Sequence, residues 1–249
     1  MTTVNDILRE IGRLAPFDTA EDFDNVGLLI GGDGEVERCL VTLDVTARTI
    51  AEAVLNNCTL ILSHHPVIFH AMKRIPADSV QGLLLRNGIT VISAHTNVDK
   101  ALLNDRLADI LGIRKLGVMP GSGDCACIGL PPEKGMTASA LARFCKEKLA
   151  GKGVRVYDTG LEIEKLALCC GGGGSFVYDL PDDVGCLISG DMKHDQVVEA
   201  VNRGVSLIDL GHFETERHFI PMMTELLSEA FPEVRFIPDE SCEPLFNHI

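Results

Sequence analysis

The stretch CLVTLDVTARTIAEAVLNNCTLILSHH (39–65) decides the fold, because its pattern is typical of a strand, a helix and a second strand, and because it occurs twice. A shift of 147 residues places it without a gap on CLISGDMKHDQVVEAVNRGVSLIDLGH (186–212), and nine of the 27 positions are identical. Ordinary composition would give roughly one or two identities. The sequence therefore predicts one strand–helix–strand unit used twice. The identical pairs are Cys39/Cys186, Leu40/Leu187, Asp44/Asp191, Glu52/Glu199, Ala53/Ala200, Val54/Val201, Leu60/Leu207, Ile61/Ile208 and His65/His212.

Alternating strand and helix patterns surround both copies and predict an α/β fold with parallel pairing. A Gly- and Pro-rich segment, 117–135, is expected to join a first α/β half (1–117) to a second (118–249), the two interlinked in one compact unit with a metal site between them. Other expected strands are 89–93, 125–130, 154–158 and 165–170, and other expected helices lie near the N-terminus and at 79–88, 103–112 and 137–150.

Composition narrows the function classes. The net charge is −14 and no Lys/Arg-rich run reverses it locally, so binding to nucleic acid or an anionic membrane surface is not expected. No apolar run reaches the length of a membrane span, and the N-terminus lacks the pattern of a signal peptide, which predicts a cytoplasmic protein. The nine cysteines show no framework spacing and are expected to be reduced and mostly buried.

Three predicted strands end in histidine or in histidine with a carboxylate. SHHP (63–66) supplies His64 and His65, SAHTNVD (93–99) supplies His95 and Asp99, and DLGHFETER (209–217) supplies His212 and Glu216. Ligands gather at the carboxyl ends of parallel strands. Two repeat units that face each other would also bring His65 and His212 together. The pattern therefore predicts one shared site.

Each motif has a simpler alternative. The two adjacent histidines would cap a strand, Asp99 would N-cap a helix over 100–110, and His212 with Glu216 would be a surface pair one helical turn apart. Taken together, three imidazoles and two carboxylates suit Zn, Fe, Mn, Co or Ni better than Ca. Five ligands are too many for one tetrahedral zinc with an open position, and they suit two divalent ions with a bridging carboxylate.

The same residues resemble the GTP cyclohydrolase I type 2-like family, also called NGG-interacting-factor-like proteins. FDNVGLLIG (23–31), SHHPVIF, AHTNVD and DLGHFETER look like its signature segments, and the likeness covers essentially the whole chain. The resemblance implies a toroidal homohexamer with dinuclear metal sites facing an inner cavity. This chain would be the short form, because 117–165 is too short for an inserted domain.

The resemblance also implies individual roles. His65 and Asp99 would bind one metal, His64 and His212 the other, Glu216 would bridge, and His95 would lie beside the site or contact substrate. The loop CCGGGGSF (169–176) matches a family segment near the site; it is either a plain turn or an anion cradle. His194, in KHDQ (193–196), is expected to be a polar residue at a helix start.

The reaction is not selected by any motif. Two metal ions would activate water and act as Lewis acids, and His95 or Glu214 would move a proton. The leading hypothesis is a metal-dependent hydrolase, with GTP cyclohydrolase-like ring opening of a nucleotide as the named candidate. The alternatives are a phosphoesterase or amidohydrolase acting on another small molecule, and a non-enzymatic metal-binding regulatory scaffold.

Overall fold

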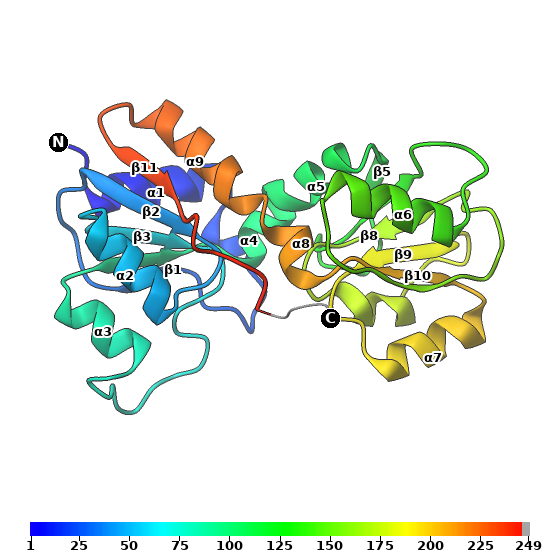
Figure 1. Ribbon diagram of the computed structural model, residues 1–249, viewed down its shortest axis with the longest axis horizontal. Coiled ribbons are helices and arrows are strands. Elements are labelled where there is room, and N and C mark those ends of the chain that lie inside the picture. The colour runs from blue at the N-terminus through cyan, green and yellow to red at the C-terminus, as the bar shows by residue number, and fades with distance from the viewer. Residues whose placement is uncertain (246–249) are drawn as a thin grey trace. The chain divides into compact units, whose positions relative to one another are not determined.

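The computed structural model describes residues 1–245 (Figure 1), and it divides the chain into two compact units. Unit 1 comprises Met1–Ala101 and Arg217–Glu243, and unit 2 comprises Leu102–Glu216 with a short piece from Pro244. The chain thus leaves unit 1 after Ala101, builds most of unit 2, returns at Arg217, and crosses to unit 2 again after Glu243. This division differs from the expected one after residue 117, because the last helix and strand of the chain complete the first sheet rather than the second.

Unit 1 is built on a five-stranded sheet in the order β1-β4-β3-β2-β11, in which every pairing except β1 with β4 is parallel. Helices lie on both faces of this sheet (Figure 1). One core packs apolar side chains of α2 and α3 against the strands. The elements are α1 (Val4–Leu14), η1 (Phe17–Thr19), β1 (Gly27–Ile30), β2 (Arg38–Thr42), α2 (Ala47–Leu55), β3 (Leu60–Ser63), α3 (Val80–Arg86), β4 (Thr90–Ser93), α4 (Thr96–Val98), α9 (Phe219–Ala230) and β11 (Arg235–Pro238).

Unit 2 contains a six-stranded mixed sheet in the order β5-β6-β8-β9-β10-β7. Its centre, β8-β9-β10, is parallel, and the outer strands run antiparallel. The helical segment η2 (Asp99–Leu103) leads into it. The elements are α5 (Asn104–Ile110), β5 (Arg114–Val118), β6 (Cys127–Leu130), α6 (Ala138–Lys148), β7 (Arg155–Tyr157), β8 (Leu166–Leu168), η3 (Gly173–Tyr178), β9 (Cys186–Ser189), α7 (His194–Arg203), β10 (Ser206–Asp209) and α8 (His212–Glu216).

The internal repeat is a structural repeat. In unit 1 the first copy forms β2, α2 and β3, and in unit 2 the second copy forms β9, α7 and β10, with the two strands parallel in both. Every residue of β2, β3, β9 and β10 is buried apart from Arg38, the first residue of β2. The predicted α/β class and the strand–helix–strand repeat are therefore confirmed.

The structure contains three strands that were not expected from the sequence, β1, β5 and β11. Strand β5 runs into the start of the Gly- and Pro-rich segment, 117–135. β5 and β6 form an antiparallel hairpin inside unit 2, so this segment is not a linker between two halves. Strands β1 and β11 lie at the two edges of the first sheet. Edge strands are short and half-covered, so their sequences carry little apolar periodicity.

The cysteines are all free thiols, and seven of the nine are buried. Burial raises the pKa of the Cys145 thiol to about 12, and it raises the pKa values of Cys39 and Cys186 still further. These thiols are therefore protonated, unreactive members of the core, as expected. Within the described residues, no helix combines the length and apolar character that crossing a membrane requires.

Candidate metal centre

Unit 1 brings three imidazole rings together at the carboxyl ends of β3 and β4. The ring centroid of His64 lies 5.0 Å from that of His65 and 5.1 Å from that of His95. One nitrogen from each ring lies within 4.8 Å of the other two. Neighbouring residues inside a strand would point to opposite faces of the sheet. The chain has left the strand at His64, and the two rings converge there.

The His64 ring is fully buried and its orientation is fixed from two sides. Its Nδ1 lies 3.0 Å from the carbonyl oxygen of Ala94, and the ring of Phe219, at the start of α9, packs 4.8 Å away. A ring nitrogen against a carbonyl oxygen carries the proton. The other nitrogen, Nε2, is therefore the one that can accept or coordinate.

Asp99 lies on the same side of unit 1 as these rings. Its Oδ1 is 3.4 Å from His64 Nε2, and its side chain is 13% exposed. Asp99 opens η2, a π-helical turn between α4 and α5, whereas the N-cap position of α5 is Leu103. The alternative in which Asp99 N-caps a helix is therefore not what the structure shows. π-Helical turns are rare and occur frequently at functional sites.

Unit 2 contributes an imidazole and a carboxylate from a single short helix. His212 begins α8 and Glu216 ends it, with His212 Nε2 2.9 Å from Glu216 Oε2. The Glu216 side chain is only 2% exposed. A buried carboxylate is not an ordinary surface pair, because removing its charge from water is costly without a cationic partner. Pro221 lies in the first turn of the separate helix α9, as a proline that starts a new helix should.

The two repeat copies place an aspartate behind each repeated histidine. Asp44 Oδ1 lies 2.8 Å from His65 Nδ1 in unit 1, and Asp191 Oδ2 lies 2.7 Å from His212 Nδ1 in unit 2. Asp44 and Asp191 follow β2 and β9 and are identical positions of the repeat. Carboxylates in this position fix the tautomer of a metal-binding histidine and raise its basicity. The sequence contained this signal in the paired aspartates, which the prediction did not use.

His95 has a partner of the same kind. Asp24 Oδ1 lies 2.9 Å from His95 Nδ1, and Asp24 Oδ2 accepts hydrogen bonds from the backbone and hydroxyl of Thr96. Burial raises the pKa of the Asp24 carboxyl, but these hydrogen bonds outweigh it and bring the pKa down to about 2. Asp24 comes from FDNVGLLIG, so that signature segment serves to hold His95.

Because the pKa of Asp24 is low, we expect this residue's contribution to stability to depend on pH in the acid range. A carboxyl whose pKa falls on folding stabilises the protein above its unfolded pKa, here 3.8, and loses that stabilisation as the pH drops toward 2. Asp24→Asn is expected to lower the free energy of unfolding by about 1–3 kcal/mol at pH 6 and by less at pH 3. Urea unfolding in the presence of a chelator measures both values. Asp22→Asn, at the exposed neighbouring position, is the control, and an equal loss at both pH values would contradict the assignment.

The glycine loop packs against the ligands of unit 2. Gly171 has a φ of +60°, and a Cβ atom there would lie 2.0 Å from Glu216 Oε1 and 3.4 Å from His212 Nε2. The N–H of Gly171 donates to Thr215 and that of Gly173 to Ser189, so both groups are used within the protein. The loop continues into η3. These contacts favour a packing role over an anion cradle.

Two other residues named from the sequence lie in unit 2. Glu214 is buried, and its carboxylate packs close to Gly211, where a Cβ would lie 2.4 Å from Oε2. His194 is exposed and is the first residue of α7, as expected. The structure thus separates the predicted residues into a unit 1 set of His64, His65, His95 and Asp99 and a unit 2 set of His212 and Glu216.

Comparison with known proteins gives a consistent match along the chain. Residues 2–241 match the family model described as Duf34/NIF3 (NGG1p interacting factor 3). A Campylobacter jejuni protein named GTP cyclohydrolase 1 type 2 homolog is 35% identical, covering 87% of this chain and 88% of its own. A Helicobacter pylori protein named GTP cyclohydrolase 1 type 2 is 31% identical, covering 91% and 92%. A hypothetical protein of Staphylococcus aureus has the same fold, with a TM-score of 0.89 at 24% identity over 99% of each chain.

Proposed function

The chain belongs to the Duf34/NIF3 (NGG1p interacting factor 3) family, and from that premise we propose that it is a metal-dependent hydrolase with a dinuclear centre. The ligands would be His64, His65, Asp99, His212 and Glu216. The observation that carries the proposal is a contact shared by four imidazole rings. In each ring, Nδ1 lies within hydrogen-bonding distance of a carboxylate or carbonyl oxygen; the residues are His64, His65, His95 and His212. That arrangement reserves Nε2 of every ring for a ligand.

The distances within each unit fit two ligands of one ion. Ligand atoms about 2.1 Å from a common ion lie about 3.0 Å apart at a right angle and about 3.4 Å apart at the tetrahedral angle. The His212–Glu216 and His64–Asp99 separations are 2.9 and 3.4 Å. Moreover, a neutral His212 ring with its proton on Nδ1 directs a lone pair at a carboxylate oxygen. Two acceptors at that distance require a proton or a cation between them.

Chain connectivity supports joining the two ligand sets into one centre. The chain passes from unit 1 to unit 2 between Ala101 and Leu102, two residues after Asp99, and returns immediately after Glu216. Phe219, which packs on the His64 ring, follows Glu216 by only three residues. A Glu216 carboxylate with two oxygens is thus suited to bridge two ions.

The assignment of ligands to ions differs from the one that the resemblance implies. Asp99 lies beside His64, which favours these two as ligands of one ion. His65 and His212 then serve the other, each backed by its repeat-equivalent aspartate. Glu216 would complete both. His95, held by Asp24, is left to contact substrate or to move a proton at Nε2.

A site of this composition supports hydrolysis. Bound divalent ions would supply Lewis acidity and lower the pKa of water. The protein's part is to hold the imidazoles in one tautomer and to offer His95 as a proton carrier beside the ligands. The names of the Campylobacter and Helicobacter relatives make GTP cyclohydrolase-like opening of a purine ring the first reaction to test. In this proposal the protein is a cytoplasmic homohexamer that acts on a small molecule, with nucleotides among the candidate substrates.

The alternatives predict different outcomes from one screen. A phosphoesterase or amidohydrolase would turn over a phosphoester or amide substrate but not GTP. A non-enzymatic metal-binding scaffold would turn over neither, whichever of Zn, Mn, Fe or Co is supplied. Native mass spectrometry of the same samples would report the number of chains in the assembly.

Metal content tests the centre directly. The purified protein is expected to hold about two transition-metal ions per chain, and His212→Ala is expected to lose at least one of them, because it removes one of the few ligands of that ion. Inductively coupled plasma mass spectrometry after dialysis gives the count. His194→Ala, which removes an exposed histidine from the same unit, should keep both ions. A wild-type protein that takes up no metal after reloading would overturn the proposal.

A further inference from the structure

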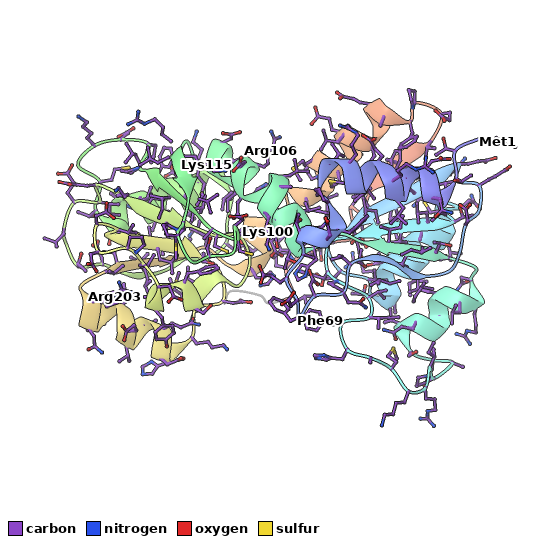
Figure 2. The ribbon with its side chains drawn as sticks, turned by 180° about the vertical axis from the view of Figure 1, so that it is seen from behind. Met1, Phe69, Lys100, Arg106, Lys115 and Arg203 are labelled. Atoms are coloured by element: carbon purple, nitrogen blue, oxygen red, sulfur yellow. The ribbon has the colours of Figure 1, made fainter. Side chains whose placement is uncertain are left out.

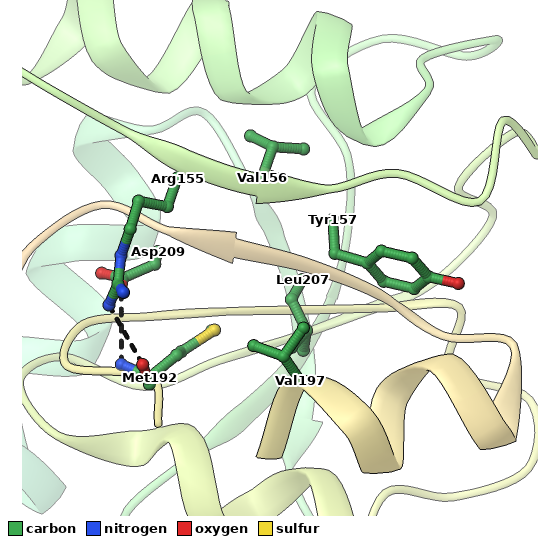
Figure 3. Close-up of a pocket in the computed structure, with 7 residues that line it drawn as sticks. All are labelled: Arg155, Val156, Tyr157, Met192, Val197, Leu207 and Asp209. Atoms are coloured by element: carbon green, nitrogen blue, oxygen red, sulfur yellow. Dashed lines mark hydrogen bonds and ion pairs between the residues drawn. The ribbon is translucent and has the colours of Figure 1, made fainter. Parts of the chain in front are cut away.

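The end of β10 carries an ion pair that the proposed ligand set does not include. β10 pairs antiparallel with β7, and Asp209, the last residue of β10, stands opposite Arg155, the first residue of β7. Arg155 Nε donates to Asp209 Oδ2 at 3.0 Å, and Nη2 donates to the same oxygen. Both residues line a pocket of about 210 Å³, and Figure 3 draws the side chains of its lining. All of these residues belong to unit 2.

The Asp209 carboxylate accepts hydrogen bonds from two turns of unit 2, one next to Asp191 and one next to His212. Its Oδ2 accepts the backbone N–H of Met192 at 3.2 Å, and its Oδ1 accepts that of Gly211 at 3.0 Å. Met192 directly follows Asp191, the partner of His212, and Gly211 directly precedes His212 itself. One carboxylate therefore ties the Asp191 turn to the His212 turn.

Arg155, on the neighbouring strand β7, makes a further contact to the same two groups. Its Nη2 also donates to the carbonyl oxygen of Met192 at 3.0 Å, so one guanidinium group grips the Asp209 carboxylate and the Asp191 turn together (Figure 3). The Asp209 side chain is 7% exposed, whereas that of Arg155 is 72% exposed. The planar fork of arginine suits such a two-point grip better than the single ammonium of lysine.

The turns at Asp191 and Gly211 both contain a residue with a positive φ angle, so they depend on surrounding contacts to keep their conformation. Asp191 adopts a left-handed backbone, with a φ of +53°, and Gly211 has a φ of +90°. A non-glycine residue in that region is strained by about 1–2 kcal/mol and persists only where its surroundings fix it. The first repeat copy has no such clamp, because the position equivalent to Asp209 is Leu62, which is buried and apolar.

We propose that Arg155 and Asp209 are positioning residues that hold Asp191 and His212 in register, so that His212 presents Nε2 to the metal ion. The proposal rests on the proposed function for its metal, but the register of the two turns is a property of the metal-free chain. We call the pair the Arg155–Asp209 brace.

The brace predicts a selective effect of Arg155→Ala. The affinity for the ion bound by His212 is expected to fall about 10–100-fold, the range for loss of groups that orient metal ligands. Competition with a chromophoric chelator measures it. Arg155→Lys keeps the charge without the fork and should fall between the wild type and Arg155→Ala. Lys165→Ala, which breaks the exposed Lys165–Asp183 pair in the same unit, is the matched control and should bind like the wild type.

A second measurement separates positioning from general loss of stability. In metal-free protein, ¹⁵N chemical shifts of the imidazoles report which ring nitrogen carries the proton. His65, whose partner Asp44 lies in unit 1, is the internal reference. Arg155→Ala should reduce protonation of His212 Nδ1 and leave His65 unchanged. Unchanged His212 shifts, or equal changes at both histidines, would overturn the brace. A wild-type protein that binds no metal would overturn the proposed function instead, while this comparison would still decide the brace.

Discussion

Replacing Glu216 with alanine is expected to remove both metal ions from the protein. Two divalent ions in one such centre lie roughly 3.5–4 Å apart. Two unit charges 4 Å apart repel by about 4 kcal/mol at an effective dielectric constant of about 20, and two divalent ions by about four times as much. A shared carboxylate offsets part of that repulsion and supplies a ligand to each ion. Its loss should therefore weaken both sites, not one.

The experiment needs to separate charge from shape. Glu216→Gln keeps the side chain's size but is neutral, and we expect it to lose both ions nearly as completely as Glu216→Ala, with affinity falling by more than about a hundredfold. Metal content and chelator competition measure the loss. Glu225→Ala, an exposed glutamate on the following helix α9, is the control. Metal content near two per chain in Glu216→Ala would show that Glu216 does not bridge.

The central strands could be predicted because the repeat carries the same information twice. Both faces are buried in the four strands of the repeat, β2, β3, β9 and β10. Their sequences are therefore nearly continuous apolar runs, each of which ends in a polar residue. β5, in contrast, is mostly exposed, with the sequence Arg114–Val118. Its place at the sheet edge depends on its antiparallel partner β6, and nothing in its own five residues encodes that partner.

The division of the chain was not predictable from local composition. Gly- and Pro-rich sequence marks turns, and in 117–135 those turns belong to a hairpin. The true crossings, after Ala101 and after Glu216, lie in helical segments without such residues. The return of β11 to pair with β2 is a contact between opposite ends of the sequence, which only the fold reveals.

In the candidate site, the histidines could be predicted from the sequence, but not which residue contacts each of them. Histidines at strand ends were visible because parallel strands place their carboxyl ends together. Which of the adjacent His64 and His65 lies beside Asp99 depends on the backbone conformation with which the chain leaves β3, and the sequence does not specify it. Asp24 reaches His95 from a segment remote in sequence. Among the basic side chains that Figure 2 labels, Lys100 pairs with Glu21, Lys115 pairs with Asp105, and Arg203 donates to the carbonyl oxygen of Val177.

A single methyl group at Gly171 is expected to disable the ligand pair of unit 2. With its φ of +60°, any residue other than glycine costs about 1–2 kcal/mol in backbone strain. The added Cβ would also lie 2.0 Å from Glu216 Oε1, far inside van der Waals contact. Glu216 is buried and ends a helix that Thr215 ties to Gly171 itself, so its carboxylate has little room to withdraw. Gly171→Ala should therefore displace Glu216 and lower the affinity for both ions.

The neighbouring glycine supplies the control. Gly172 has a φ of −90°, and a Cβ placed there would meet nothing within 4 Å. Gly172→Ala should retain about two ions per chain and wild-type stability. Gly171→Ala should lose at least about 1–2 kcal/mol in metal-free urea unfolding and more than tenfold in metal affinity. Normal metal affinity in a destabilised Gly171→Ala protein would mean that the loop supports the fold alone. Joint loss would mean that the absence of a side chain at Gly171 is what leaves space for the Glu216 carboxylate.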